Sequence, residues 1–206
     1  GHGANCGEGT HLKFHDAQGA TPLDPDDMAG LVPTHITTQS DLNAWEQANI
    51  AQGDRWAARQ KNRDVLNEGF ARALHRHMFD QTWRWAGTFR HSNKNIGVDW
   101  PQVSVKLRDL LDNTRYQIEN HVFNEDEVAV RFHHQLALIH AFPNGNGRHA
   151  RLMADLLVKR LGRPRLTWGG ASAALTPVGA IRDRYLVALR LADQGQLDGL
   201  IEFARS

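Results

Sequence analysis

The residues best suited to chemistry lie in the run from His140 to Arg151, whose sequence is HAFPNGNGRHAR. Gly145 and Gly147 let the backbone approach a ligand closely and adopt positive φ angles, and Asn146 between them also tolerates left-handed geometry. A glycine-rich turn that opens a helix leaves unpaired N–H groups facing outward, with the positive end of the helix dipole behind them. Such a turn is typical of a phosphate-binding site.

The charged side chains beside this turn fit the same chemistry. Arg148 and Arg151 are three residues apart, so both guanidinium groups can face one side of the new helix and bind phosphate oxygens bidentately. His140 ends the preceding helix, and an imidazole with a pKa of about 6.5 can accept a proton near neutral pH. Phosphoryl and nucleotidyl transfer need mainly positioning and charge stabilisation, which these groups supply. The structural alternative is an interhelical turn with surface arginines and a capping histidine.

Two helices are expected on either side of the turn. Apolar residues recur at spacings of three and four between Asp126 and Ile139, and this helix ends before Pro143. A second helix begins near Gly147 and continues to Leu161, where a following glycine and proline give a stop signal. The turn therefore lies in a loop between two helices.

Outside the motif, the sequence predicts an irregular leader, several helices and one short β-hairpin. An irregular leader is expected over residues 1–36, because glycine, proline and aspartate occur there with little periodicity. Residues 88–101 combine a β-tolerant stretch with a polar tip and a closing proline, which predicts a short hairpin. Helices are expected near residues 37–61 (with a break near Gly53), 64–80, 105–118, 180–195 and 197–204.

Composition excludes some classes of protein. With 206 residues, 41% of them hydrophobic, the chain can bury one sizeable core, so one domain is expected. A net charge of +1 gives no basic field for nucleic acid, and we expect no direct nucleic-acid binding. No apolar run reaches the roughly 18 residues of a spanning helix, so no membrane association is expected and a cytoplasmic location is the default. The lone Cys6 agrees with a reducing compartment.

The run HAFPNGNGRHAR resembles the signature of the Fic (Fic/Doc) family, with a histidine, a phenylalanine two residues later, GNGR, and a second arginine three residues after that. TWRWAGTFR at 82–90 resembles the family's approach to its flap hairpin, and residues 182–203 resemble its C-terminal helices. The resemblance covers roughly residues 40–204 and is greatest to the mobile mystery protein B group. The matching motif positions are His140, Phe142, Gly145, Asn146, Gly147, Arg148 and Arg151.

This resemblance implies an all-α fold, a Fic-type helical bundle with a short β-hairpin flap, over residues 37–206. It implies transfer of AMP from ATP to a tyrosine, threonine or serine hydroxyl of a protein substrate, with His140 as the base. The backbone of Gly145, Asn146 and Gly147 would hold the phosphates together with Arg148 and Arg151, and Phe142 would anchor the loop. The target segment would add as a strand to the flap residues Ser92, Asn93, Lys94, Asn95 and Ile96.

One motif position departs from the family pattern. Asn144 stands where the family has an acidic residue that holds Mg²⁺ on the phosphates. An amide binds a hard cation more weakly than a carboxylate does, so the nucleotide would hold Mg²⁺ or Mn²⁺ together with Asn144. Reduced activity and a different phosphate-containing donor are the alternatives. A nucleotide-binding regulatory module without turnover is therefore the second functional hypothesis, and a toxin held by an antitoxin partner is compatible with the first.

The helix near 38–50 predicts a regulatory contact. Fic proteins often carry an inhibitory helix whose glutamate pairs with the second arginine of the motif, and Glu46 is the candidate here, with Arg151 as its partner. The match is partial, because Leu42 and Gln47 replace the residue types usual at those positions. The alternative is an exposed glutamate on a surface helix.

Overall fold

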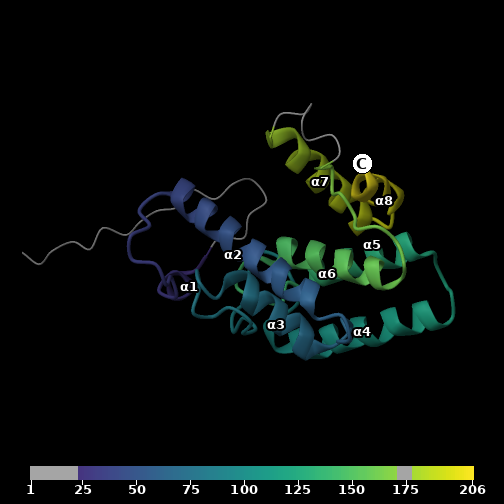
Figure 1. The fold of residues 1–206 in the computed structure, drawn as a ribbon, viewed down its shortest axis with the longest axis horizontal. Helices are drawn as coiled ribbons and strands as arrows, with labels where there is room; N and C mark the ends of the chain where they lie inside the picture. Colours follow the sequence, from purple (N-terminus) through teal and green to yellow (C-terminus); the bar gives the residue numbers. More distant parts are fainter. Residues whose placement is uncertain (1–22, 171–177) are drawn as a thin grey trace, which may run out of the picture.

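The computed structural model describes residues 23–170 and 178–206, so most of the expected leader lies outside the described residues. Within those two ranges the chain is helical, as expected, and contains no strand, so the predicted β-hairpin is missing. None of these helices has both the length and the apolar character needed to span a bilayer. The elements drawn in Figure 1 are α1 (Pro25–Met28), α2 (Gln39–Arg59), α3 (Glu68–Phe79), a 3₁₀ turn η1 (Trp100–Gln102), α4 (Val103–Glu119), α5 (Glu125–Ile139), α6 (Asn146–Arg160), α7 (Val178–Asp193) and α8 (Asp198–Arg205).

The main core lies where α3, α5 and α6 meet, with α2 packed on α3 and α4 packed on α5. The predicted apolar stripe of the third helix is buried, with Phe70, Leu74 and Met78 each no more than 1% exposed. Phe132 of α5 and Met153 of α6 join the same cluster. Burial of these side chains supplies the main drive for folding and fixes α5 and α6 side by side.

A second, smaller core joins the C-terminal helices to the bundle. Ala154 and Val158 of α6 are fully buried against Leu200 and Phe203 of α8, and α7 packs along α8. Figure 1 shows α7 in yellow-green and α8 in yellow, above α5 and α6 in that view. The α5–α6 pair is therefore covered on both sides and forms a rigid support for the loop between its helices.

The helix break expected near Gly53 is not present, and α2 continues through it. A Cβ atom at Gly53 would lie 2.6 Å from Cγ of Met78 and 2.9 Å from its Cα atom. The absence of a side chain therefore lets α2 pack closely against α3, and this close approach outweighs the low helix propensity of glycine. This glycine is a packing residue.

The hairpin expected over residues 88–101 is not formed, because residues 91–99 make a bent loop without paired strands. Arg90 donates from its guanidinium group to the carbonyl oxygens of Ser92 and Val98, one at each end of this loop. A buried side chain thus joins the two arms, which a ladder of backbone hydrogen bonds would join in a hairpin. We keep the name flap for residues 91–99.

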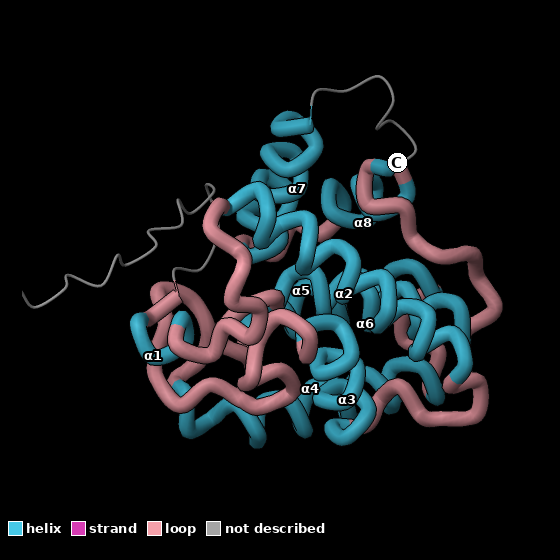
Figure 2. Tube along the Cα trace, turned by 60° about the vertical axis from the view of Figure 1, so that its left-hand side comes forward, coloured by secondary structure: helices cyan, strands magenta, loops and turns pink. Residues whose placement is uncertain are grey.

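The described part of the leader is more ordered than expected. It contains α1, and its end runs beside the chain before the flap, where Leu31 forms an isolated bridge with Trp83. Gly30 accepts a hydrogen bond from the backbone of Arg84, and Val32 donates one to Thr82. Figure 2 shows α1 among the loops that gather on one side of the molecule. The leader therefore covers the flap side of the bundle.

Candidate active site

The loop between α5 and α6 is closed by its own side chains. His140 ends α5 in a left-handed conformation with φ of 54°, and Asn146 begins α6. The Asn146 side chain accepts from the backbone N–H of Phe142 at 2.9 Å and donates to the carbonyl of the same residue at 2.8 Å. Asn146 is buried, so its side chain shapes the loop and only its backbone can face a ligand.

A histidine of α3, which the sequence did not single out, supports this loop from below. The His75 ring stacks on Phe142 with centroids 3.7 Å apart, and its Nε2 donates to the carbonyl of Asn144 at 3.0 Å. Its Nδ1 accepts from the N–H of Gly87 at 3.0 Å, which places the ring proton on Nε2. Complete burial lowers the pKa of His75 well below its usual value, so the ring stays neutral. Phe142 is 1% exposed and lies in the core as expected of an anchor.

The two glycines of the turn have different roles. Gly145 has a φ of +79°, and a Cβ atom there would lie 2.5 Å from the ring of Phe79, so the fold itself requires glycine. Gly147 sits in the first turn of α6, and a Cβ atom there would come no closer than 3.8 Å to the nearest protein atom, the hydroxyl of Tyr185. Packing within the protein therefore leaves open space beside Gly147, where a ligand can approach the backbone.

Most of the amides expected to bind phosphate are available. Within the described ranges no protein group accepts a hydrogen bond from the N–H of Asn146, Gly147 or Arg148, and no side chain caps α6. Gly145 is the exception, because its N–H donates to Oδ1 of Asn144 at 2.6 Å. The anion-binding group is therefore the start of α6 from Asn146 onward.

The two arginines of the motif lie beside different helices. Arg148 forms an ion pair with Glu46 of α2 at 2.6 Å and lies over the ring of Phe79. Arg151 lies over the ring of Tyr185 in α7, 4.9 Å from its centroid. The predicted pairing of Glu46 with Arg151 is therefore wrong. Arg148 lies in the first turn of α6, which faces α2, whereas Arg151 comes one turn later beside α7.

Glu46 is held in place for this contact. It is only 6% exposed, and its Oε1 accepts a 2.8 Å hydrogen bond from the indole N–H of Trp83 while Oε2 meets Arg148. A buried carboxylate of this kind needs its cation and its hydrogen bond to offset the cost of desolvation. The alternative of an exposed helix glutamate is therefore excluded.

Tyr185 holds Arg151 from the C-terminal helices and is a residue that the sequence did not reveal. Its hydroxyl lies 3.0 Å from Nε2 of His133, which is fully buried in α5. Burial raises the pKa of Tyr185, and the charge and hydrogen bond of Arg151 oppose that rise. The phenol therefore stays neutral and supports the guanidinium group with its ring.

His140 is buried and uncharged at neutral pH. The residue is 5% exposed, and the pKa of its imidazole is lowered to about 4, first by desolvation and then by the positive charge of Arg90. A hydrogen bond to the carbonyl of Ala137 opposes this shift, and the charge of Lys94 adds to it. A neutral imidazole is the form that a general base requires.

Arg90 connects this histidine to the flap. Arg90 is 2% exposed, and its guanidinium group donates to four main-chain carbonyl oxygens. The bond from Nε is the one to the carbonyl oxygen of His140, at 2.6 Å. The backbone N–H of Arg90 also donates to Ala141 at 3.0 Å. Neither the base nor the flap can therefore shift without breaking bonds to Arg90.

The flap itself lies directly over the base. Gly97 has a φ of +105°, and a Cβ atom there would lie 2.7 Å from Cβ of His140. Lys94 points under the leader, where its side chain is only 2% exposed. The other predicted flap residues are exposed, namely Ser92, Asn93, Asn95 and Ile96.

The side chains near the motif do not fit a metal held by the protein. Oδ1 of Asn144 accepts from the N–H of Gly145 and from Arg148 at 3.3 Å, so hydrogen-bond donors and a cation already surround this oxygen. In the described part of the chain, no group of three histidine, cysteine or acidic residues has the arrangement of a metal site. We therefore derive no step through a metal ion.

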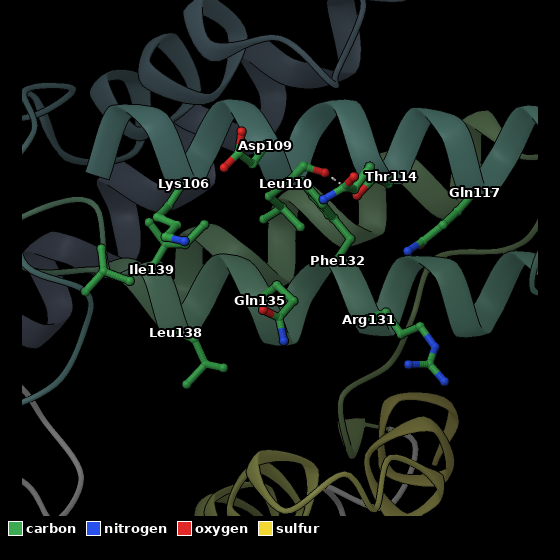
Figure 3. A pocket seen from close by; sticks show the side chains of 12 residues that line it. Lys106, Asp109, Leu110, Thr114, Gln117, Arg131, Phe132, Gln135, Leu138 and Ile139 are labelled. Atoms are coloured by element: carbon green, nitrogen blue, oxygen red, sulfur yellow. Dashed lines mark hydrogen bonds between the residues drawn. The ribbon is translucent and has the colours of Figure 1, made fainter. Parts of the chain in front are cut away.

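A groove of about 560 Å³ lies elsewhere, between α4 and α5. Figure 3 shows Leu110 and Phe132 among its lining side chains, with Lys106 and Arg131 also lining it. No residue of the loop between α5 and α6 lines it. The groove therefore lies beside the candidate active site and meets it only at Val98 of the flap and at Ile139, the last residue of α5.

The family model described as Fic/DOC matches residues 65–158, a range that runs from just before α3 into α6 and includes the whole motif. Residues 65–158 thus match the Fic/DOC family. The range is narrower than the predicted 37–206, and those outer limits remain a prediction.

The chain has relatives in sequence and structure. Protein adenylyltransferase fic-1 of Caenorhabditis elegans is 28% identical over 122 residues, which cover 57% of this chain and 22% of that protein. The structure of C. elegans Fic-1 residues 134–508 matches with a TM-score of 0.62 and 23% identity, over 78% of this chain and 48% of that one. The structure of BepC, a VirB-translocated effector of Bartonella tribocorum with bound AMPPNP, matches with a TM-score of 0.63 and 16% identity. The match covers 82% of this chain and 87% of BepC. The chain thus spans 22% of its curated relative, and the structural matches establish its fold.

Proposed function

We propose that this chain is a protein adenylyltransferase, which transfers AMP from ATP to a hydroxyl group of a protein. The observation that carries the proposal is the buried, neutral His140 next to a helix start whose amides are available for phosphate. The relative in C. elegans is named a protein adenylyltransferase, and the structure of BepC contains AMPPNP. The name of the relative and the ligand of BepC both support a nucleoside triphosphate as the donor of the transferred group.

The proposed reaction assigns one role to each group. The amides of Asn146 and Gly147 and the guanidinium groups of Arg148 and Arg151 bind the phosphates and stabilise the charge that develops in the transition state. His140 takes the proton from the acceptor hydroxyl as its oxygen forms a bond to the α-phosphorus. The bond from that phosphorus to the leaving oxygen breaks, and pyrophosphate departs. The flap holds the target segment beside His140, through its backbone and exposed side chains.

Glu46 gives the proposal a regulatory element. Its carboxylate occupies Arg148, a group that the nucleotide needs, so phosphate and carboxylate compete for one guanidinium. We propose that the structure represents a restrained form of the enzyme, in which α2 lowers the affinity for nucleotide.

The function is tested by incubating the protein with ATP labelled on the α-phosphate, together with Mg²⁺ or Mn²⁺, and measuring the added mass. We expect one AMP group per modified hydroxyl in the unaltered protein or an added acceptor, and a loss of about a hundredfold or more in His140→Ala. Nucleotide binding without any label would favour the second candidate, a regulatory module, which the neutral Asn144 supports. Label that does not depend on His140 would refute the proposed mechanism.

A further inference from the structure

A basic side chain of the flap is buried against two acidic residues of the leader. Nζ of Lys94 lies 2.5 Å from Oδ2 of Asp24 and 2.5 Å from Oδ2 of Asp27. Burial alone would lower the pKa of Lys94, but the hydrogen bonds and charges of both carboxylates raise it. The ammonium group is therefore charged and is neutralised within the chain.

This ion cluster lies near the candidate base. The charge of Lys94 is close enough to lower the pKa of His140, and Gly97 of the same loop contacts that histidine. The ammonium group therefore lies near the imidazole. The leader contacts the flap at a second residue as well, since Asp24 also accepts a hydrogen bond from Ser92 at 3.2 Å.

The contacts between the leader and Lys94 are polar, while Leu23, Met28 and Leu31 of the leader pack against the main core. Helix α1 has four residues and none of them is buried. The side chain of Asp24 is 49% exposed and that of Asp27 is 16% exposed. Ion pairs with exposed partners contribute little net stability, because water solvates the separated charges well. Lys94 cannot be left buried without an anion, so another carboxylate can take the place of those of Asp24 and Asp27 because the exchange keeps an anion against the ammonium group.

We propose that Lys94 binds an acidic side chain next to the acceptor hydroxyl of the target protein, and that Asp24 and Asp27 occupy this site until the target displaces them. The substrate class is thus a hydroxyl residue flanked by aspartate or glutamate. This inference rests on the proposed function, because it takes the flap as the surface that binds the target. The leader acts as an internal competitor whose tethering gives it a high effective concentration.

The test is a binding measurement that requires no turnover. A fluorescein-labelled peptide with one tyrosine between glutamates is titrated against the full chain, beside a matched peptide with glutamines, and anisotropy is recorded. We expect the double variant Asp24→Asn, Asp27→Asn to bind the acidic peptide at least about tenfold more tightly than the unaltered chain, because the site is no longer occluded. Addition of Lys94→Met should remove this gain, and the glutamine peptide should not show it.

Asp26→Asn is the matched control, since Asp26 lies in the same segment but is exposed. If the double variant bound the acidic peptide no better than this control, or bound both peptides equally, the proposal would be overturned. In the unaltered protein, hydrogen exchange of residues 23–31 should rise on saturation with the acidic peptide, and unchanged exchange would also overturn it. Peptide binding as expected, without AMP transfer in any assay, would sink the proposed function and leave the acid-binding site standing.

Discussion

Nε of Arg90 donates a 2.6 Å hydrogen bond to the carbonyl oxygen of His140, and the same guanidinium group bonds both ends of the flap. His140 has a positive φ, which is unfavourable for a residue with a side chain and must be maintained by its surroundings. Arg90 therefore sets the position of the base and that of the flap together.

Replacement of Arg90 should affect turnover more than nucleotide binding. Arg90→Lys keeps the charge but cannot reach several carbonyl oxygens at once, so we expect kcat to fall by about tenfold to a hundredfold with a smaller change in KM for ATP. Added guanidinium ion should restore part of the activity of Arg90→Ala, at concentrations that leave the fold intact by circular dichroism. Equal losses in kcat and in nucleotide affinity, without rescue, would indicate a purely structural role.

The pH dependence of transfer should reflect the unusual environment of His140. Its pKa is lowered to about 4, so the neutral base persists well below neutral pH, and kcat/KM should stay level down to about pH 5 and fall below it. Bound phosphates add negative charge and should raise this pKa, so the midpoint in kcat should lie above the midpoint in kcat/KM. The free energy of unfolding should also fall as pH falls from about 6.5 toward 4, because the unfolded chain binds a proton at His140 more readily than the folded one does.

NMR titration of the His140 ring in the unaltered protein measures this pKa directly. His75 and His149 are internal controls, because both are also buried with lowered pKa values but lie outside the proposed proton transfer. A midpoint near the ordinary histidine value would contradict the buried position found for His140.

Local patterns in the sequence predicted the helices on both sides of the motif, because apolar spacing and stop signals act within one element. The structure leaves open space beside Gly147, and ligand approach at this residue stays a prediction. Local patterns could not predict the partner of Glu46, since 102 residues separate it from Arg148 and the pairing depends on how α3 places α2 and α6 relative to each other. The role of Arg90 was hidden for the same reason, because its acceptors are main-chain carbonyl groups, which leave no mark in the sequence.

Removing the charge of Glu46 should release Arg148 for the nucleotide. Glu46→Gln keeps an oxygen for the indole N–H of Trp83, so we expect the fold to be retained and the affinity for a non-hydrolysable ATP analogue to rise by about fivefold or more. Isothermal titration calorimetry measures the change. Asp54→Asn is the matched control, because Asp54 is an acidic residue of α2 that pairs with an arginine outside the motif, Arg165, at 3.0 Å. If both variants bound the analogue equally, Glu46 would not compete with the nucleotide.

Substitution of the two glycines of the turn should affect two different properties, nucleotide affinity at Gly147 and stability of the fold at Gly145. In Gly147→Ala the new methyl group meets no protein atom closer than 3.8 Å, and alanine favours helix, so the free energy of unfolding should be unchanged or higher by up to about 1 kcal/mol. The same methyl group stands where the phosphates approach the amides, so nucleotide affinity should fall by about tenfold or more. In Gly145→Ala the positive φ and the 2.5 Å approach to Phe79 should instead lower the stability of the fold. Urea unfolding and calorimetry on both variants test this difference, and a stable Gly147→Ala that binds the nucleotide normally would show that the start of α6 is not the phosphate site.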